Sequence, residues 1–163
     1  MADLGCGEAS LTRFLAAHFL KVTAVDFAPE TLFRNRSESA GPNVTFRRRD
    51  LSDLTPFRSC FHVAVAARSI AGSSTSDVDR ILSQIWGSLV EGGVLMATLP
   101  AGMERDRPVS LAVAAPHRPR GPFHEMELQF RLLRVGFQGV RIRRLEDPDG
   151  SMLLALAVRR GLN

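Results

Sequence analysis

The sequence predicts an α/β fold in which one sheet carries helices on both faces, and three observations support this prediction. Strand-like and helix-like segments alternate along most of the 163 residues. An almost continuous apolar run at 61–67 is typical of a parallel strand that is buried on both faces. A Gly-x-Gly turn joins the first strand to the first helix, as in doubly wound nucleotide-binding folds.

Each element follows from its apolar pattern and from the residues that bound it. Apolar and β-branched runs mark the strands, and apolar positions at helical spacing mark the helices. Pro29 starts the second helix and Ser76 is expected to cap the third. Glycines at 41, 92–93 and 136 are expected to end the last three helices. The expected strands are 1–5, 21–26, 44–49, 61–67, 94–99, 138–145 and 151–159, and the expected helices are 9–19, 29 to the break at Gly41, 77–90 and 125–135.

The segment 101–122 has a different character from the rest of the chain. It holds four prolines with Arg and His between them and shows no sustained periodicity, which is typical of a functional or disordered loop. Further on, Asp147-Pro148-Asp149-Gly150 predicts a hairpin between the last two strands. We find no repeat and no linker, so residues 1–163 are expected to form a single domain, with 101–123 as a substrate or lid loop.

Composition excludes several classes of protein. No apolar run approaches the ~20 residues needed to span a bilayer, and the start of the chain lacks a signal peptide pattern, so we expect no membrane association and a cytoplasmic location. Cys6 and Cys60 have neither metal-site nor disulfide spacing, so reduced thiols and no metal are expected. The net charge of +4 would suit binding to nucleic acid. The arginines are scattered along the sequence and form no continuous basic stripe, so nucleic acid is the less favoured partner.

The glycine turn is the strongest functional signal. Gly5 and Gly7 carry no Cβ, so the backbone can approach a ligand closely, and the N–H groups of the next helix face that ligand. Ser10 stands where a dinucleotide fingerprint has its third glycine, and Glu8 would repel a pyrophosphate. A zwitterionic aminoacyl sulfonium tolerates Glu8 better, and an NAD(P)-binding oxidoreductase is the less favoured alternative.

The segment from Asp3 to Gly7, Asp-Leu-Gly-Cys-Gly, resembles motif I of the class I S-adenosylmethionine (SAM)-dependent methyltransferases. Five further segments resemble later elements of this family and follow in the family's order, so that the resemblance covers residues 2–158. They are Asp26 at the end of the second strand, Asp50-Leu51 after the third, the fourth strand at 61–67, the Gly-Gly segment at 89–95, and the Leu-Leu to Gly-Phe segment at 132–137.

This resemblance implies a Rossmann-like, doubly wound, mostly parallel sheet of seven strands with an antiparallel last strand. SAM would lie over the ends of strands one, two and four. A carboxylate at Asp26 can accept hydrogen bonds from both ribose hydroxyls. Asp50, or alternatively Asp53, would accept from the adenine amino group. The expected cofactor-binding residues are Asp3, Gly5, Cys6, Gly7, Asp26, Phe27, Asp50, Leu51 and Ala67.

The chain departs from the family pattern at Ala9, His62 and Glu91, where relatives have Gly, Asp and Pro. Relatives also have a helix before motif I that covers part of the cofactor. The expected alternatives are a truncated sequence, a partner chain or dimer that covers this site, or a cofactor that is more open than usual. A small-molecule acceptor is expected, and His117 and His124 are the candidates for a catalytic base. An RNA methyltransferase and a non-catalytic methyltransferase-like binding or assembly domain are the alternatives.

Overall fold

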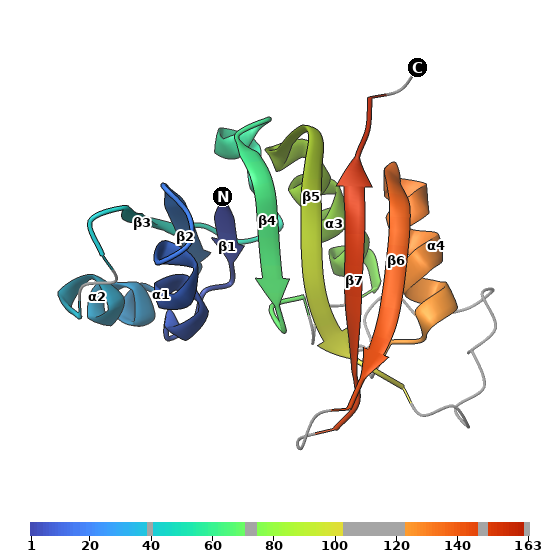
Figure 1. Cartoon of the computed structure of the whole chain (residues 1–163), viewed down its shortest axis with the longest axis horizontal. Helices are drawn as coiled ribbons and strands as arrows, with labels where there is room; N and C mark the ends of the chain where they lie inside the picture. Colours follow the sequence, from blue (N-terminus) through green and yellow to red (C-terminus); the bar gives the residue numbers. More distant parts are fainter. Residues whose placement is uncertain (39–40, 71–74, 103–122, 147–149, 162–163) are drawn as a thin grey trace.

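Seven strands form one sheet in the order β3-β2-β1-β4-β5-β7-β6 (Figure 1). The computed structural model of the protein describes residues 1–38, 41–70, 75–102, 123–146 and 150–161. Strands β1 to β5 run parallel, and β7 runs antiparallel to both of its neighbours, so the mostly parallel sheet with an antiparallel last strand is confirmed. The strands are β1 (Ala2–Leu4), β2 (Val22–Asp26), β3 (Val44–Arg48), β4 (Phe61–Ala67), β5 (Leu89–Pro100), β6 (Phe137–Leu145) and β7 (Met152–Arg159).

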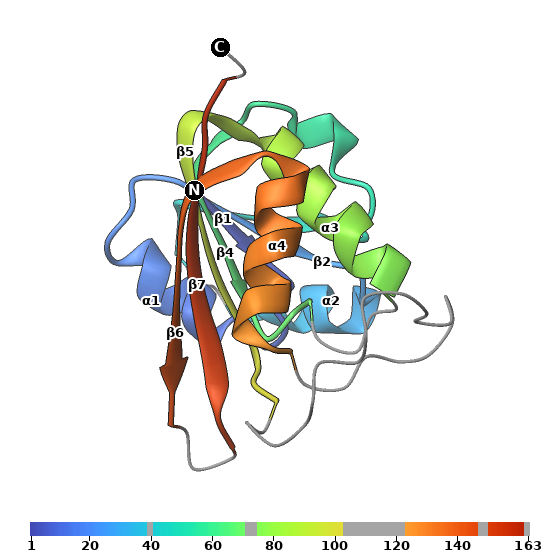
Figure 2. The same cartoon turned by 90° about the vertical axis from the view of Figure 1, so that its right-hand side faces the viewer.

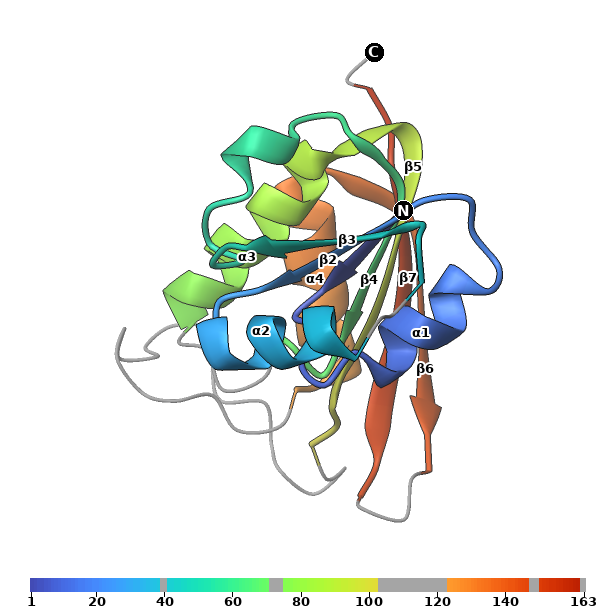
Figure 3. The ribbon, with the colours of Figure 1, turned by 90° about the vertical axis from the view of Figure 1, so that its left-hand side faces the viewer.

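In the part of the chain that the structure describes, four α-helices and one short 3₁₀ helix surround this sheet. Helices α3 and α4 pack on one face, where Leu82, Ile85, Leu128 and Leu132 help to form the main hydrophobic core (Figure 2). Helices α1 and α2 lie on the other face, over the part of the sheet formed by β1, β2 and β3 (Figure 3). The helices are α1 (Ser10–Ala16), α2 (Pro29–Ser37), η1 (Thr55–Phe57), α3 (Thr75–Ser88) and α4 (Glu125–Val135).

One face of the β5-β7-β6 part of the sheet is open. Leu95, Ala97 and Leu99 point into the main core, so the alternating residues of β5 point to the opposite face. Met96 on that face is 40% exposed. No described helix lies over that face of β5, β7 and β6 (Figures 1 and 2). We call this surface the open face; its side chains are Val94, Met96, Thr98, Leu154, Leu156, Val158, Arg141 and Arg143.

The expected turn between the third helix and the fifth strand is wrong. Gly92 and Gly93 lie inside β5, which begins at Leu89 directly after α3. The pairing of β4 with β5 shifts its register between Phe61 and Val63, so the residues between Leu89 and Val94 form a bulge or irregularity within β5. A Cβ on Gly93 would lie 2.8 Å from the Val90 carbonyl oxygen, which explains the glycine.

Other boundaries differ by a few residues. Helix α1 ends at Ala16 rather than at residue 19, and α3 begins at Thr75, so Ser76 is inside the helix and is not its N-cap. The expected loop at 103–122 and the tip of the hairpin at 147–149 lie outside the described residues. Cys6 is buried and Cys60 is exposed, and neither forms a disulfide among the described residues. None of the described helices combines the length and apolarity needed to cross a membrane.

Candidate functional site

The predicted site residues meet at one edge of the sheet. Because β1 to β4 run parallel, their carboxyl ends lie at the same edge. Gly5 follows β1, Asp26 ends β2, Asp50 follows β3 and Ala67 ends β4. The structure therefore brings together residues that are far apart in the sequence, at the position where open α/β sheets bind their ligands.

The glycine turn has a left-handed backbone at three positions, with φ of +76° at Gly5, +47° at Gly7 and +58° at Ala9. A Cβ on Gly5 would lie 2.3 Å from the Cβ of Ser69, so only glycine allows the turn to pack against the segment after β4. The N–H groups of Gly5 and Cys6 both donate to the Val25 carbonyl oxygen, at 2.8 and 3.0 Å. These contacts fix the turn between β1 and β2.

Asp26 connects the end of β2 to this turn. Its side chain is 8% exposed, Oδ2 accepts the Gly7 N–H at 2.9 Å, and Oδ1 accepts the Ala28 N–H at 2.9 Å. A carboxylate offers about four acceptor positions, so two backbone donors leave capacity for further donors such as a pair of hydroxyls. Asp26 thus fits the ribose-binding role while also holding the turn.

Asp3 and Cys6 are buried behind the turn. The Asp3 carboxylate accepts the Thr12 hydroxyl of α1 at 2.5 Å, and burial raises the pKa of this carboxyl group. Burial raises the pKa of the Cys6 thiol to about 12, and the nearby charges of Asp3 and Asp26 act in the same direction. Cys6 therefore stays protonated at neutral pH and is not a nucleophile.

The remaining predicted cofactor residues on the loops after β2 and β3 differ in their exposure. Phe27 is 71% exposed, while Leu51 packs partly buried against the main core. Asp50 is exposed, and its Oδ1 accepts the Ser52 N–H at 2.8 Å, which lowers the pKa of the Asp50 carboxyl group. Asp53 instead accepts the Thr55 hydroxyl at 2.8 Å. Both carboxylates stabilise the loop after β3.

Of the three histidines named in the sequence analysis, the structure describes two, His124 and His62. His124 precedes α4, and its ring lies against Gly102, where a Cβ would be 3.1 Å from His124 Cε1. The Phe123 N–H donates to the Pro100 carbonyl oxygen at 2.8 Å, which places His124 near the carboxyl end of β5, at the site edge. His62 is exposed near the start of β4, at the opposite edge, and His117 lies outside the described residues.

Two further polar side chains lie at the turn, and sequence reasoning missed the first of them, Asn35. Asn35 of α2 is 1% exposed, and its Nδ2 donates to the Gly7 carbonyl oxygen at 2.7 Å. The Ser69 hydroxyl, next to Gly5, is buried and has no hydrogen-bond partner among the described residues. The position of Asn35, three residues after the buried Leu32, was the available signal, because residues three apart share one helix face.

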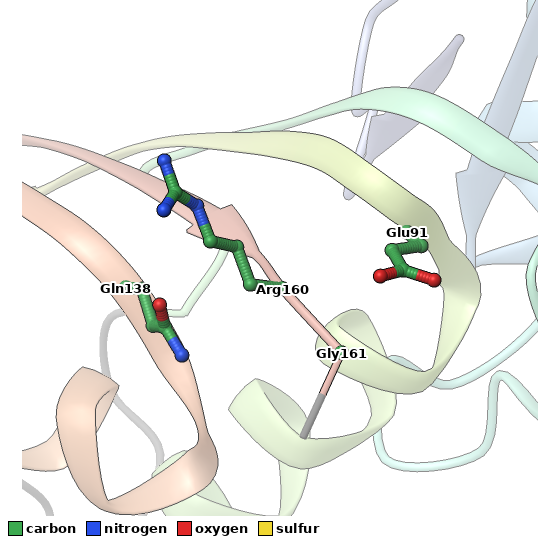
Figure 4. Close-up of a pocket in the computed structure, with 4 residues that line it drawn as sticks. All are labelled: Glu91, Gln138, Arg160 and Gly161. Carbon is green, nitrogen blue, oxygen red and sulfur yellow. The ribbon is translucent and has the colours of Figure 1, made fainter. Parts of the chain in front are cut away.

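A depression of about 300 Å³ lies elsewhere on the molecule, at the opposite edge of the sheet. Side chains and backbone of β5, of β6 and of the segment after β7 line it (Figure 4): Glu91, Gln138, Arg160 and Gly161. None of the predicted site residues contributes to it. Among the described residues, no group of His, Cys, Asp and Glu could hold a metal ion.

Comparison with known proteins identifies the family. A family model described as a methyltransferase domain matches residues 1–93, which is more than half of the 163-residue chain. Among proteins of curated function, none matches the sequence. A SAM-dependent methyltransferase from Methanosarcina mazei superposes with a TM-score of 0.77 at 19% identity, covering 98% of this chain and 91% of that chain.

Two further solved structures share the fold. The Burkholderia thailandensis 1,6-didemethyltoxoflavin-N1-methyltransferase, with bound 1,6-didemethyltoxoflavin and S-adenosylhomocysteine, has a TM-score of 0.79 at 22% identity, covering 98% of this chain and 70% of that chain. A methyltransferase of Haloferax volcanii, in complex with a methyltransferase activator, has a TM-score of 0.79 at 15% identity, covering 99% and 82%. The chain therefore belongs to the methyltransferase domain family, with the fold of a class I SAM-dependent methyltransferase.

Proposed function

We propose that this methyltransferase transfers a methyl group from SAM to a small-molecule acceptor. The observation that carries the proposal is the buried Asp26 carboxylate at the end of β2, tied to the Gly7 N–H beside a turn with left-handed glycines. This arrangement offers free acceptor positions next to a backbone that a ligand can approach closely. Both properties suit a nucleoside with a zwitterionic amino-acid end.

The residues present fit SAM. Asp26 would hold the ribose hydroxyls, while Phe27 would pack against the adenine and Asp50 would accept from its amino group. Gly5, Gly7 and Ala67 would lie along the rest of the cofactor, with Asp3 and Cys6 behind the turn. When bound, SAM supplies an activated methyl group on a sulfonium. The chain contributes mainly by holding both reactants in line, since positioning alone can supply much of the rate.

We propose a small molecule that carries a carboxylate or another anionic group as the acceptor. The segment 101–123 follows β5 at the site edge and holds Arg105, Arg107, Arg118 and Arg120, although 103–122 lie outside the described residues. Arginine binds carboxylates through two parallel hydrogen bonds. His124, at the same edge, is the described candidate for a base if the acceptor must lose a proton. The Burkholderia methyltransferase with its bound small molecule supports this choice over RNA.

We also propose that a partner chain or a second copy covers part of the site and of the open face. The Haloferax methyltransferase, which is bound to an activator, supports this arrangement. The apolar side chains of the open face, such as Met96 and Leu156, support it as well. The expected cytoplasmic location stays a prediction.

Calorimetric titration with S-adenosylhomocysteine tests the cofactor assignment. One site is expected, and Asp26→Ala should weaken binding at least about tenfold, which corresponds to about 1.4 kcal/mol. Glu38→Ala is the matched control, because that carboxylate pairs with Arg13 at the C-terminal end of α2, and the variant should bind within about twofold of wild type. Binding of NADH in place of S-adenosylhomocysteine would instead identify an oxidoreductase, and binding of neither would favour the non-catalytic domain.

A further inference from the structure

Asn35 occupies a position that helix stability does not explain. Asparagine is a poor residue for a helix interior, and in α2 it shares the buried face with Leu32 alone. Its side-chain oxygen Oδ1 is buried without a hydrogen-bond partner among the described residues. Leaving a buried acceptor unpaired destabilises a fold, whereas an apolar residue of similar size would avoid this penalty.

The one hydrogen bond described for the Asn35 side chain reaches the glycine turn. Nδ2 donates to the Gly7 carbonyl oxygen at 2.7 Å, across 28 positions of the sequence. The Gly7 N–H donates in turn to Asp26 Oδ2 at 2.9 Å. Both backbone polar groups of Gly7 are therefore held by buried side chains, one from β2 and one from α2.

Fixing the Gly7 carbonyl group also fixes the next N–H group. The peptide unit is planar and trans, so the Gly7 C=O and the Glu8 N–H point in opposite directions. Because the carbonyl points toward α2, the Glu8 N–H is directed away from that helix. This peptide joins the left-handed Gly7 to Glu8, and the left-handed Ala9 follows; glycine adopts this conformation freely, whereas the surroundings must hold the alanine in it.

We propose that Asn35 is a positioning residue for the cofactor. It holds the Gly7–Glu8 peptide in the orientation in which the turn binds SAM, and it acts through the backbone without touching the cofactor. This role deepens the proposed function, because it depends on SAM binding at the glycine turn. It also explains why the fold keeps a buried amide whose oxygen is unpaired.

The test compares stability with affinity for S-adenosylhomocysteine. Asn35→Leu removes the unpaired oxygen, which favours stability, and the donor to the Gly7 carbonyl oxygen, which opposes it, so the urea midpoint should change little while the dissociation constant increases about tenfold. Asn35→Ala, which cannot overpack the site, should show the same loss of affinity if the leucine variant does not fold. Asn43→Ala is the matched control, since the Asn43 amide bonds the carbonyl oxygens of Ala16 and Phe19 away from the turn. The Asn43→Ala variant should be less stable than wild type and should keep the wild-type affinity for S-adenosylhomocysteine.

Hydrogen exchange at the Glu8 amide gives a second readout that a purely structural role would not change. In wild type, S-adenosylhomocysteine should slow this exchange, and in Asn35→Leu it should slow it much less. If wild type binds S-adenosylhomocysteine and both Asn35 variants bind within twofold of it, the role of Asn35 is overturned and the cofactor site stands. If wild type does not bind, the proposed function and the role of Asn35 are overturned together.

Discussion

Two buried carboxylates, Asp3 and Asp26, lie on neighbouring strands behind the glycine turn. Asp26 could be singled out from the sequence, because a carboxylate at the end of a second parallel strand faces the ligand crevice. The burial of Asp3 and the contribution of Asn35 could not, because each depends on how a helix packs: α1, directly after the turn, for Asp3, and the more distant α2 for Asn35. At this scale the sequence shows which groups are present, and packing decides which of them reach a ligand.

The pH dependence of stability should report the buried state of Asp3. Burial raises the folded-state pKa of this carboxyl group above its ordinary value of 3.8. In the window between these two pKa values the folded state binds more protons than the unfolded state, so the free energy of unfolding falls as pH rises. Asn at this position does not titrate. The stability of Asp3→Asn relative to wild type should therefore increase with pH across this window and then level off.

Urea unfolding of Asp3→Asn and wild type from about pH 4 to about pH 7 checks this sign. The Asn variant alters the contact with Thr12 at every pH, so only the change of the difference with pH is informative. If the difference in free energy of unfolding between the two proteins is independent of pH, or if it shifts in favour of wild type as pH rises, Asp3 is not held in a desolvated position.

At the scale of elements, helices α2 and α4 and strand β4 could be predicted closely, because each has a clear periodicity and a clear boundary residue. The Gly92-Gly93 pair could not be interpreted correctly. Two glycines after a helix are typical of a turn, but they equally suit a bulge in which the backbone approaches a neighbouring strand. The close approach of Gly93 to the carbonyl groups of Val90 and Phe61 exists only in the folded sheet.

A matched pair of glycine substitutions tests the bulge. Gly93→Ala should destabilise the protein by about 1–3 kcal/mol, because its Cβ would meet backbone at 2.8 and 3.0 Å. Gly87→Ala, near the end of α3 where a Cβ has no neighbour within 4 Å, should stabilise it by up to about 1 kcal/mol. Urea midpoints of the two variants decide the matter, and a neutral Gly93→Ala would mean that the tight approach in β5 is wrong.

At the scale of the whole molecule, the strand order follows from the alternation of elements together with the family resemblance. The open face does not follow from the sequence. Strand β7 is apolar on both faces, with Leu154 and Leu156 on one and Leu153 and Ala155 on the other, which predicts burial on both sides. Only the folded structure shows that the described helices cover just one of the two faces of β7 (Figures 1 and 2).

Substitutions at two neighbouring residues of β5 test this difference between the covered face and the open face. Leu95→Asp places a carboxylate in the main core and should cost about 4 kcal/mol or more, whereas Met96→Asp on the open face should stay within about 1 kcal/mol. Thermal unfolding of both variants gives the comparison. If a second copy covers the open face, as proposed above, Met96→Asp should also reduce the molecular mass in solution; if Met96→Asp destabilises the single chain as much as Leu95→Asp, the difference between the two faces is wrong.

The central claim is that SAM binds at the carboxyl edge of β1 and β2, and a crystal structure with S-adenosylhomocysteine tests it most directly. The expected result is a ligand over Gly5 and Gly7, with both ribose hydroxyls within hydrogen-bond distance of the Asp26 carboxylate and the adenine beside Phe27 and Asp50. A ligand at the opposite edge of the sheet, among Glu91, Gln138 and Arg160, or a ribose that makes no contact with Asp26, would contradict the account.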